Sequence, residues 1–248
     1  MSRQDSQHGA PDSYHHSLIT SGPIIDCQLI PRGSNYIFLA TISDEAGGQK
    51  VKAVYKPQEG EAPLWDFPTG TLYRREYAAY LVSQALGWDF VPLTVIRDGP
   101  YGTGSVQLFI DAVPGSNYFT LQDARKADFC RFFVFDCLVN NADRKAGHCL
   151  LDRKGHLWSV DHGITFHHMP KLRTVIQEFC GRPMPQELKR DLARLAGPLE
   201  PSGALRAELA GLLSQREIEA LRGRLRWLLE AEILPLLDPY YSIPWPPV

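Results

Sequence analysis

The order of its two halves constrains this 248-residue sequence most, because strand-like segments come first and helix-like segments follow. Five short apolar runs, rich in β-branched and aromatic residues, are typical of strands. They cover residues 24–30, 36–42, 51–56, 91–97 and 105–111. The first two runs flank a Pro, Gly, Ser and Asn cluster, which predicts a hairpin. The first half therefore predicts an antiparallel sheet.

Helical spacing of apolar residues appears once in the first half, at 74–86, where Gly87 is a suitable stop. Further helices are expected in the second half, around one small hairpin at 148–151 and 157–161. They cover residues 123–139, with Asp123 as N-cap, and 185–196, 205–213 and 215–234, the last opened by a capping box at 214–217.

This order predicts an α+β fold of two lobes. We expect a strand-rich N-terminal lobe with one helix over residues 18–111 and a helical C-terminal lobe over residues 112–240. A disordered polar tail is expected at 1–17, and a Pro-rich tail that cannot be helical at 241–248.

Composition excludes several classes of protein. The 26 basic and 28 acidic residues give a net charge of −2, which argues against nucleic acid as a partner. No stretch approaches the ~18 uncharged apolar residues of a membrane span, so no integral membrane contact is expected. Five cysteines without a CxxC pair indicate reduced thiols in a cytoplasmic protein, and argue against a disulfide framework or zinc site.

The residues most informative for chemistry are Asp143 and Asp161, which lie 18 positions apart on either side of the small hairpin. Protein kinases have a catalytic loop H-R-D-x-x-x-x-N and then D-F-G. By spacing, Asp143 takes the place of the proton-accepting Asp, His148 that of the Asn, and Asp161 that of the metal-binding Asp. Gly163 completes the D-x-G pattern.

Phosphoryl transfer needs such an arrangement, because it depends mainly on positioning and on neutralising charge. One carboxylate has to reach the acceptor hydroxyl, and another has to hold a divalent ion against the triphosphate of ATP. The pattern therefore predicts catalysis by Asp143 and a metal site at Asp161 and His148, with Mg²⁺ or Mn²⁺ and ATP as cofactors.

The run N-x-D-R-x-x-G at 141–147, followed by a hairpin and D-H-G, resembles the catalytic core of the phosphatidylinositol 3- and 4-kinase superfamily, most of all its small bacterial branch. The resemblance spans roughly residues 24–180 and includes the segments 55–57, 75–80 and 135–141. It implies a two-lobed protein-kinase-like fold and an ATP-dependent phosphotransferase.

The resemblance also implies a nucleotide site. Lys56 would contact the α- and β-phosphates, and Glu76 would pair with Lys56. The turn Gly33, Ser34 and Asn35 would cover the phosphates with its backbone N–H groups. The hinge that recognises adenine would be the segment 107–111, which includes Gln107, Phe109 and Asp111.

The sequence departs from the family at His148, where the larger eukaryotic members have Asn. Imidazole is a softer ligand than the oxygens that Mg²⁺ prefers, so Mn²⁺ would compete better at this site. The segment 164–173, expected to line the acceptor site, has Lys171 and Arg173 as its cations, with modest help from His167 and His168. We therefore expect a protein or small-molecule hydroxyl as the phosphate acceptor rather than an inositol lipid.

Two other functions stay open at this point. A pseudokinase would bind a nucleotide and act by its shape, and the missing Asn at 148 favours it. A nucleotidyltransferase on a kinase fold would transfer AMP instead of phosphate.

Overall fold

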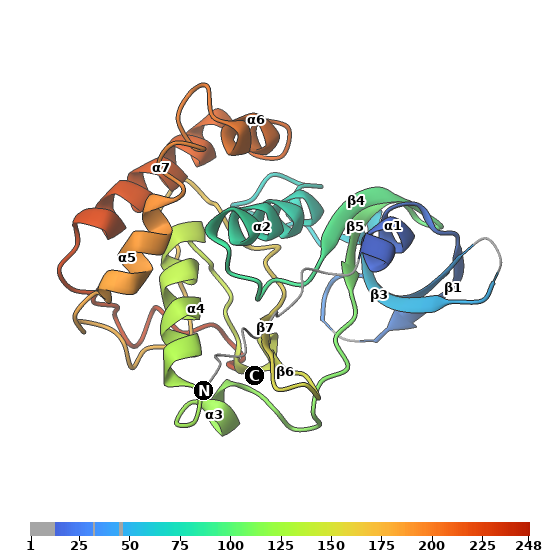
Figure 1. Ribbon diagram of the computed structural model, residues 1–248, viewed down its shortest axis with the longest axis horizontal. Coiled ribbons are helices and arrows are strands. Elements are labelled where there is room, and N and C mark those ends of the chain that lie inside the picture. Colours follow the sequence, from blue (N-terminus) through green and yellow to red (C-terminus); the bar gives the residue numbers. More distant parts are fainter. Residues whose placement is uncertain (1–12, 32, 45–46) are drawn as a thin grey trace, which may run out of the picture.

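The computed structural model describes residues 13–31, 33–44 and 47–248. An antiparallel sheet lies at one side of the molecule and most of the helices at the other (Figure 1). The sheet consists of β1 (Ile24–Ile30), β2 (Ile37–Ser43), β3 (Lys50–Pro57), β4 (Thr94–Gly99) and β5 (Gly102–Leu108). Its strand order is β1-β2-β3-β5-β4. The expected hairpin is confirmed, since β1 pairs antiparallel with β2.

The helix α1 (Ser13–Ser21) corrects the expected N-terminal tail. Residues 13–17 belong to this helix, and residues 1–12 lie outside the described residues. Leu18 and Ile19 of α1 are buried in the core of the sheet, with Phe38 and Ile42 of β2. Burial of these two side chains stabilises a short polar helix that its own sequence would leave marginal.

The helix α2 (Leu72–Leu86) lies between the sheet and the other helices (Figure 1). It ends as expected at Gly87, whose φ of 67° is left-handed. Its small and apolar residues Ala78, Ala79 and Val82 are buried in the large core of the helical part, and Tyr80 packs against both cores. Helix α2 is therefore held by the helical part as well as by the sheet.

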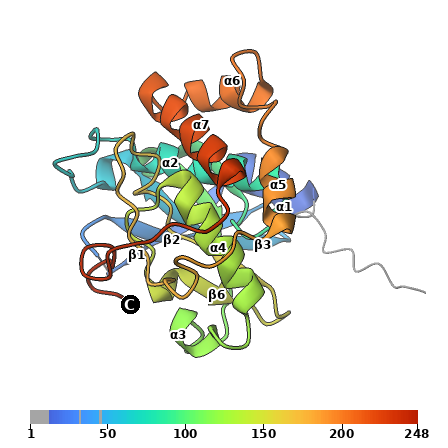
Figure 2. The same cartoon turned by 90° about the vertical axis from the view of Figure 1, so that its left-hand side faces the viewer.

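The helical part surrounds α4 (Lys126–Val139), whose phenylalanines fill its core. The other elements are α3 (Tyr118–Leu121), η2 (Ala146–His148), β6 (Cys149–Leu151), β7 (Leu157–Ser159), α5 (Gln186–Ala193), α6 (Ala204–Ala210) and α7 (Gln215–Glu230). Helix α4 begins at Lys126 with Arg125 as N-cap, so the expected start at Asp123 is wrong. The capping box Ser214–Glu217 is confirmed at the start of α7, which packs against α4 (Figure 2).

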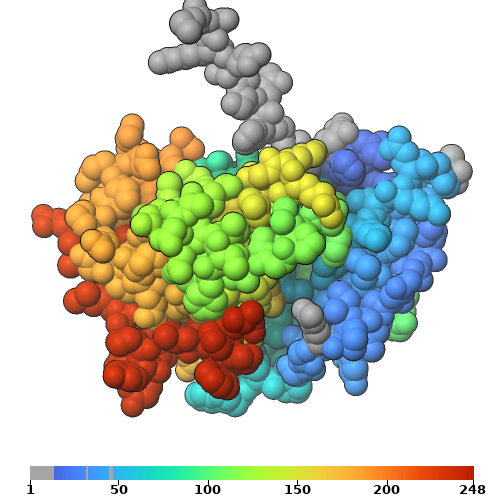
Figure 3. All heavy atoms as spheres, turned by 90° about the horizontal axis from the view of Figure 1, so that it is seen from below, coloured from blue at the N-terminus to red at the C-terminus, as the bar shows by residue number. Residues whose placement is uncertain are grey.

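The C-terminal residues are not helical, as expected, but they are not a free tail. The carbonyl of Pro247 accepts a hydrogen bond from the N–H of Ala146 at 2.8 Å, and that of Ser242 accepts one from Thr174 at 2.8 Å. A hollow separates this segment, in red, from the sheet, in blue (Figure 3). Backbone pairing therefore fixes the Pro-rich segment beside the loop that follows α4.

Among the described residues, no helix has both the length and the apolar character needed to cross a bilayer.

Candidate active site

Three charged side chains from distant parts of the chain meet at the centre of the site. Lys56 of β3 forms an ion pair with Glu76 of α2. Its Nζ also lies 2.8 Å from Oδ1 of Asp161, which follows β7. Glu76 is buried, whereas the side chain of Asp161 is 44% exposed. One cation therefore lies between two carboxylates, of which Asp161 is accessible to a ligand.

The environment favours the charged forms of Lys56 and Asp161, as a phosphate and metal site requires, but not that of Glu76. Burial lowers the pKa of Lys56, but Asp161 and Glu76 outweigh it and the net pKa is raised. Burial raises the pKa of Asp161, but Lys56 and His148 outweigh it and hold the pKa well below its usual range. Burial also raises the pKa of Glu76, and the neighbouring charge of Asp161 adds to the effect.

Glu76 is fixed in place by its own helix and by the loop after Asp161. At the start of α2, the N–H groups of Leu72 and Tyr73 donate hydrogen bonds to the carboxylate of Glu61. The N–H of His162 donates to Oε2 of Glu76 at 2.9 Å. A Cβ at Gly163 would lie 3.4 Å from Oε1 of Glu76, an ordinary contact distance.

A buried ion pair supports the loop that carries Asp143. The guanidinium of Arg144 binds the carboxylate of Asp136 through three hydrogen bonds of 2.9–3.2 Å, and both side chains are fully buried. Arg144 also donates to the carbonyl of Val160 at 3.0 Å. This pair joins α4 and the loop at 141–148 to the segment just before Asp161.

The middle residue of D-H-G is part of the same network. Nε2 of His162 accepts a hydrogen bond from Arg144 at 2.8 Å, because a guanidinium can only donate. Nδ1 therefore carries the proton, and this buried atom has no partner among the described residues. Asp161 itself has a left-handed φ of 61°. The network thus holds Asp161 in an uncommon backbone conformation that points its carboxylate at Lys56.

Asp143 lies in the loop after α4 and pairs with Lys145 at 3.0 Å. Its N–H donates to Oδ1 of Asn141, and Nδ2 of Asn141 donates in turn to Oδ1 of Asp136. Burial raises the pKa of Asp143, and the charge of Asp161 raises it further, although Lys145 opposes the shift. Asp143 and Asp161 therefore influence each other electrostatically, as expected for two carboxylates in one site.

His148 lies beside Asp161, with Nε2 3.2 Å from Oδ2. Its Nδ1 accepts a hydrogen bond from the N–H of Lys145 at 3.4 Å, which favours the tautomer with a proton on Nε2. Burial, the main cause, lowers the pKa of His148 to about 4. In this tautomer the neutral ring orients Asp161 through Nε2. Nε2 can ligate a metal only if its proton leaves.

No group of three or more His, Cys, Asp or Glu side chains that could hold a metal is present in the described part of the chain. Asp161 and His148 nevertheless form a convergent pair. Two protein ligands suit Mg²⁺ in a nucleotide site, because phosphate oxygens and water complete its coordination. The residues therefore fit a divalent ion that is bound together with ATP.

The expected hinge and phosphate loop have contacts of their own outside this cluster. Gln107 is buried and donates to Thr94 at 2.8 Å, and Phe109 donates its N–H to the carbonyl of Lys52. Asp111 pairs with Arg153 at the surface. In the expected phosphate loop, Gly33 and Ser34 are exposed, and Oδ1 of Asn35 accepts a hydrogen bond from Ala62.

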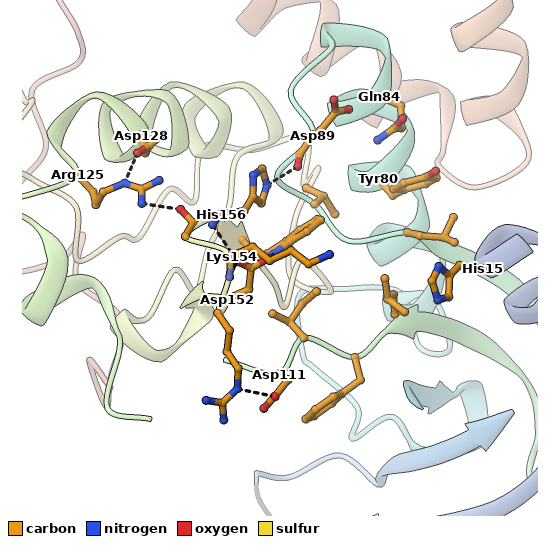
Figure 4. Close-up of a pocket in the computed structure, with 18 of the residues that line it drawn as sticks. His15, Tyr80, Gln84, Asp89, Asp111, Arg125, Asp128, Asp152, Lys154 and His156 are labelled. Atoms are coloured by element: carbon orange, nitrogen blue, oxygen red, sulfur yellow. Dashed lines mark hydrogen bonds and ion pairs between the residues drawn. The ribbon is translucent and has the colours of Figure 1, made fainter. Parts of the chain in front are cut away.

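A cavity of about 980 Å³ lies beside the expected hinge (Figure 4). Helix α2 contributes Tyr80 and Gln84, the expected hinge contributes Phe109 and Asp111, and the β6–β7 turn contributes Lys154. The residues that line this cavity do not include Lys56, Asp143, His148 or Asp161. This cavity is therefore distinct from the cluster of charged residues.

On the expected acceptor side, the cations are largely neutralised. Lys171 pairs with Asp66 at 2.6 Å, and its Nζ lies 5.1 Å from the ring centroid of Trp65. His167 is buried and its carbonyl accepts a hydrogen bond from Asn140. Arg173 and His168 are exposed.

Sequence reasoning missed two partners in this site. In the sequence, Arg144 is part of the N-x-D-R motif, and Lys145 has no predicted role. Both follow Asp143 directly, so the signal was a cluster of two cations next to the predicted catalytic acid. The role of Arg144 depends on Asp136 and His162, which only the folded chain brings close, whereas Lys145 pairs with its near neighbour Asp143.

No protein-family model matches the chain. A protein of Mycobacterium tuberculosis (strain ATCC 25618 / H37Rv), "Protein Rv2133c", is 38% identical over 266 aligned positions, which cover 93% of this chain and 94% of that protein.

Solved structures show the same fold at low identity. The Golgi casein kinase has a TM-score of 0.52 and 15% identity, and the match covers 89% of this chain and 75% of that one. The Helicobacter pylori proinflammatory kinase CtkA has a TM-score of 0.50 and 14% identity, with 85% and 95% covered. The expected α+β, kinase-like fold is thereby confirmed.

Proposed function

This chain belongs to the family of the Mycobacterium tuberculosis protein Rv2133c, and we propose that it is an ATP-dependent phosphotransferase of the phosphatidylinositol 3-/4-kinase-like type. The observation that carries the proposal is the position of Lys56 between Glu76 and Asp161. The kinase-like fold agrees with it. A purely structural ion pair would not need a second, half-exposed carboxylate.

In the proposed complex, the nucleotide lies between the sheet and the helical part. Lys56 contacts the α- and β-phosphates, and Glu76 holds Lys56 in place. The turn Gly33–Asn35 covers the phosphates, and the segment 107–111 contacts adenine through its backbone. Half-buried Leu39 and Val54 share the strand face of Lys56 and offer an apolar surface to the base.

A Mg²⁺ or Mn²⁺ ion held by Asp161 and His148 would neutralise charge on the triphosphate when bound. This role for His148 requires loss of the Nε2 proton, whereas Asp161 is already ionised.

Asp143 is the proposed catalytic base. It accepts the proton of the acceptor hydroxyl, whose oxygen forms a bond to the γ-phosphorus while the bond from that phosphorus to the bridging β-γ oxygen breaks and ADP leaves. Lys145 opposes the effect of burial, which raises the pKa of Asp143. The contribution of Asp143 is expected in turnover rather than in ATP binding.

The proposed acceptor is a protein or small-molecule hydroxyl. An anionic inositol head group needs free cations, but Lys171 is neutralised by Asp66. Arg173 remains exposed beside the loop. One exposed cation suits a neutral acceptor better than a polyphosphorylated one.

Nucleotide binding tests the proposal. ATP with Mg²⁺ or Mn²⁺ is expected to raise the melting temperature of the wild-type chain, by linkage. Lys56→Met is expected to reduce this shift, and Lys50→Met, at an exposed lysine of the same strand, to leave it unchanged. A melting temperature that neither metal–ATP complex changes would refute the proposed nucleotide site.

A further inference from the structure

Helix α7 reaches the active site through a buried ion pair. Nη2 of Arg75 in α2 lies 2.6 Å from Oε1 of Glu217 in the first turn of α7. Both side chains are buried. Arg75 directly precedes Glu76, the residue that pairs with Lys56. A residue 142 positions away in sequence is thus bonded to the neighbour of a proposed nucleotide-site residue.

The guanidinium of Arg75 joins several segments at once. Besides Glu217, its Nη1 donates to the carbonyl of Thr165 at 2.6 Å, in the loop that follows Asp161. Its Cζ lies 4.9 Å from the ring centroid of Phe67. Arg75 therefore binds α2 both to α7 and to the segment that positions Asp161.

Glu217 is itself held rigidly. Its Oε2 accepts hydrogen bonds from the N–H and the hydroxyl of Ser214, each at 2.8 Å, which leaves Oε1 for Arg75. Burial raises the pKa of Glu217, but Arg75 and the bonds from Ser214 outweigh it, so the net pKa is lowered. The acceptor for Arg75 is thus a fixed, ionised carboxylate.

A second arginine of α7 contacts the other side of the site. Nε of Arg224 donates to the carbonyl of Leu138 at 2.7 Å, in the last turn of α4. Nη1 donates to the carbonyl of His167 at 3.3 Å. Helix α7 therefore contacts α2, which carries Glu76, the end of α4, which precedes the loop of Asp143, and the loop that follows Asp161.

We propose that Arg75 and Glu217 are positioning residues that hold α2 where Glu76 can pair with Lys56. The proposal rests on the proposed function for its catalytic meaning. If α2 moved away from the cleft, the guanidinium of Arg75 and the carboxylate of Glu217 would be buried without each other, which is strongly unfavourable. Helix α7 of the same chain thus helps to keep the Lys56 pair assembled.

The alternative is an ordinary structural ion pair. Its loss would lower the stability of the fold and leave the geometry at Glu76 unchanged in the molecules that remain folded. A positioning role predicts instead that loss of the ion pair displaces Glu76. Turnover would then fall because Glu76 no longer pairs with Lys56.

The first test is hydrogen exchange of the full chain without nucleotide. Arg75→Met/Glu217→Gln removes both charges and leaves neither one buried alone. Faster exchange is expected in α2 and at 162–166, relative to wild type and to Glu219→Gln, at the exposed carboxylate of the same helix. Unchanged exchange in α2, or a change confined to α7, would overturn the proposal. This readout needs no ATP, so it stands apart from the proposed function.

The second test is a double-mutant cycle in turnover, measured below the melting temperature of every variant. Arg75→Met/Glu217→Gln is expected to lower turnover by about tenfold through loss of the competent position of α2. Adding the same two changes to the Glu76→Gln variant is expected to lower its turnover little further. Additive losses would assign the pair a structural role only. If wild type neither binds nor turns over ATP, the proposed function fails, and the exchange result alone decides the position of α2.

Discussion

Replacing Arg144 by Met is expected to destabilise the frame of the active site strongly. The change leaves Asp136 fully buried without the three hydrogen bonds that the guanidinium supplies. Among the residues that the structure describes, only the amide of Asn141 still donates to its carboxylate. Breaking one side of a buried pair costs roughly 3–5 kcal/mol. For a chain of this size, that corresponds to a fall in melting temperature of roughly 6–20 °C.

The β6–β7 turn provides a matched control. Arg153 forms an ion pair with Asp111 in which both side chains are mostly exposed, at 65% and 71%. Arg153→Met is therefore expected to leave the melting temperature nearly unchanged, because an exposed ion pair is screened by solvent. Differential scanning fluorimetry and urea unfolding of both variants provide the comparison. Equal, small losses for the two variants would show that the Arg144–Asp136 pair does not hold this loop.

Three further predictions concern individual acids and a histidine. Asp143→Asn is expected to abolish turnover and to leave the ATP-induced melting shift nearly intact; near wild-type turnover would make Asp143 structural. His148→Asn is expected to retain some turnover and to shift metal preference from Mn²⁺ toward Mg²⁺, and unchanged preference in metal titrations would remove His148 from the metal site. The pKa of Glu217 is lower in the folded chain than in the unfolded chain, where it is ~4.3. Ionised Glu217 therefore stabilises the fold above pH ~4.3, and this contribution is lost as pH falls through the folded pKa. Acid unfolding should accordingly be steeper below pH ~4.3 in wild type than in Glu217→Gln, and parallel curves would contradict this linkage.

Local patterns predicted most of the elements near the site. The alternation in β3 and the helical spacing of α2 placed Lys56 and Glu76 correctly on neighbouring elements. The capping box at Ser214 marked the start of α7 because its reciprocal bonds lie within four residues. In these cases the stabilising partners are close in sequence, so the sequence carries the signal.

Long-range packing explains what the sequence did not reveal. Helix α1 has a polar sequence, and it depends on burying Leu18 and Ile19 against the sheet. The partners of Arg75 and Arg144 are fixed by tertiary contacts, so the sequence does not reveal which residues these arginines bind. The C-terminal residues resembled a free tail because their anchoring bonds come from the backbone, which leaves no side-chain pattern.

The central claim is that the Lys56–Glu76–Asp161 cluster supports transfer of the γ-phosphoryl group. The most direct measurement incubates the protein and cell extract with ATP labelled at either the α- or the γ-phosphate, with Asp161→Asn as control. The account predicts incorporation of γ-label alone, in a metal-dependent reaction that the variant abolishes. Incorporation of α-label would indicate AMP transfer, and bound ATP with no incorporation of either label would indicate a pseudokinase; both results contradict the account.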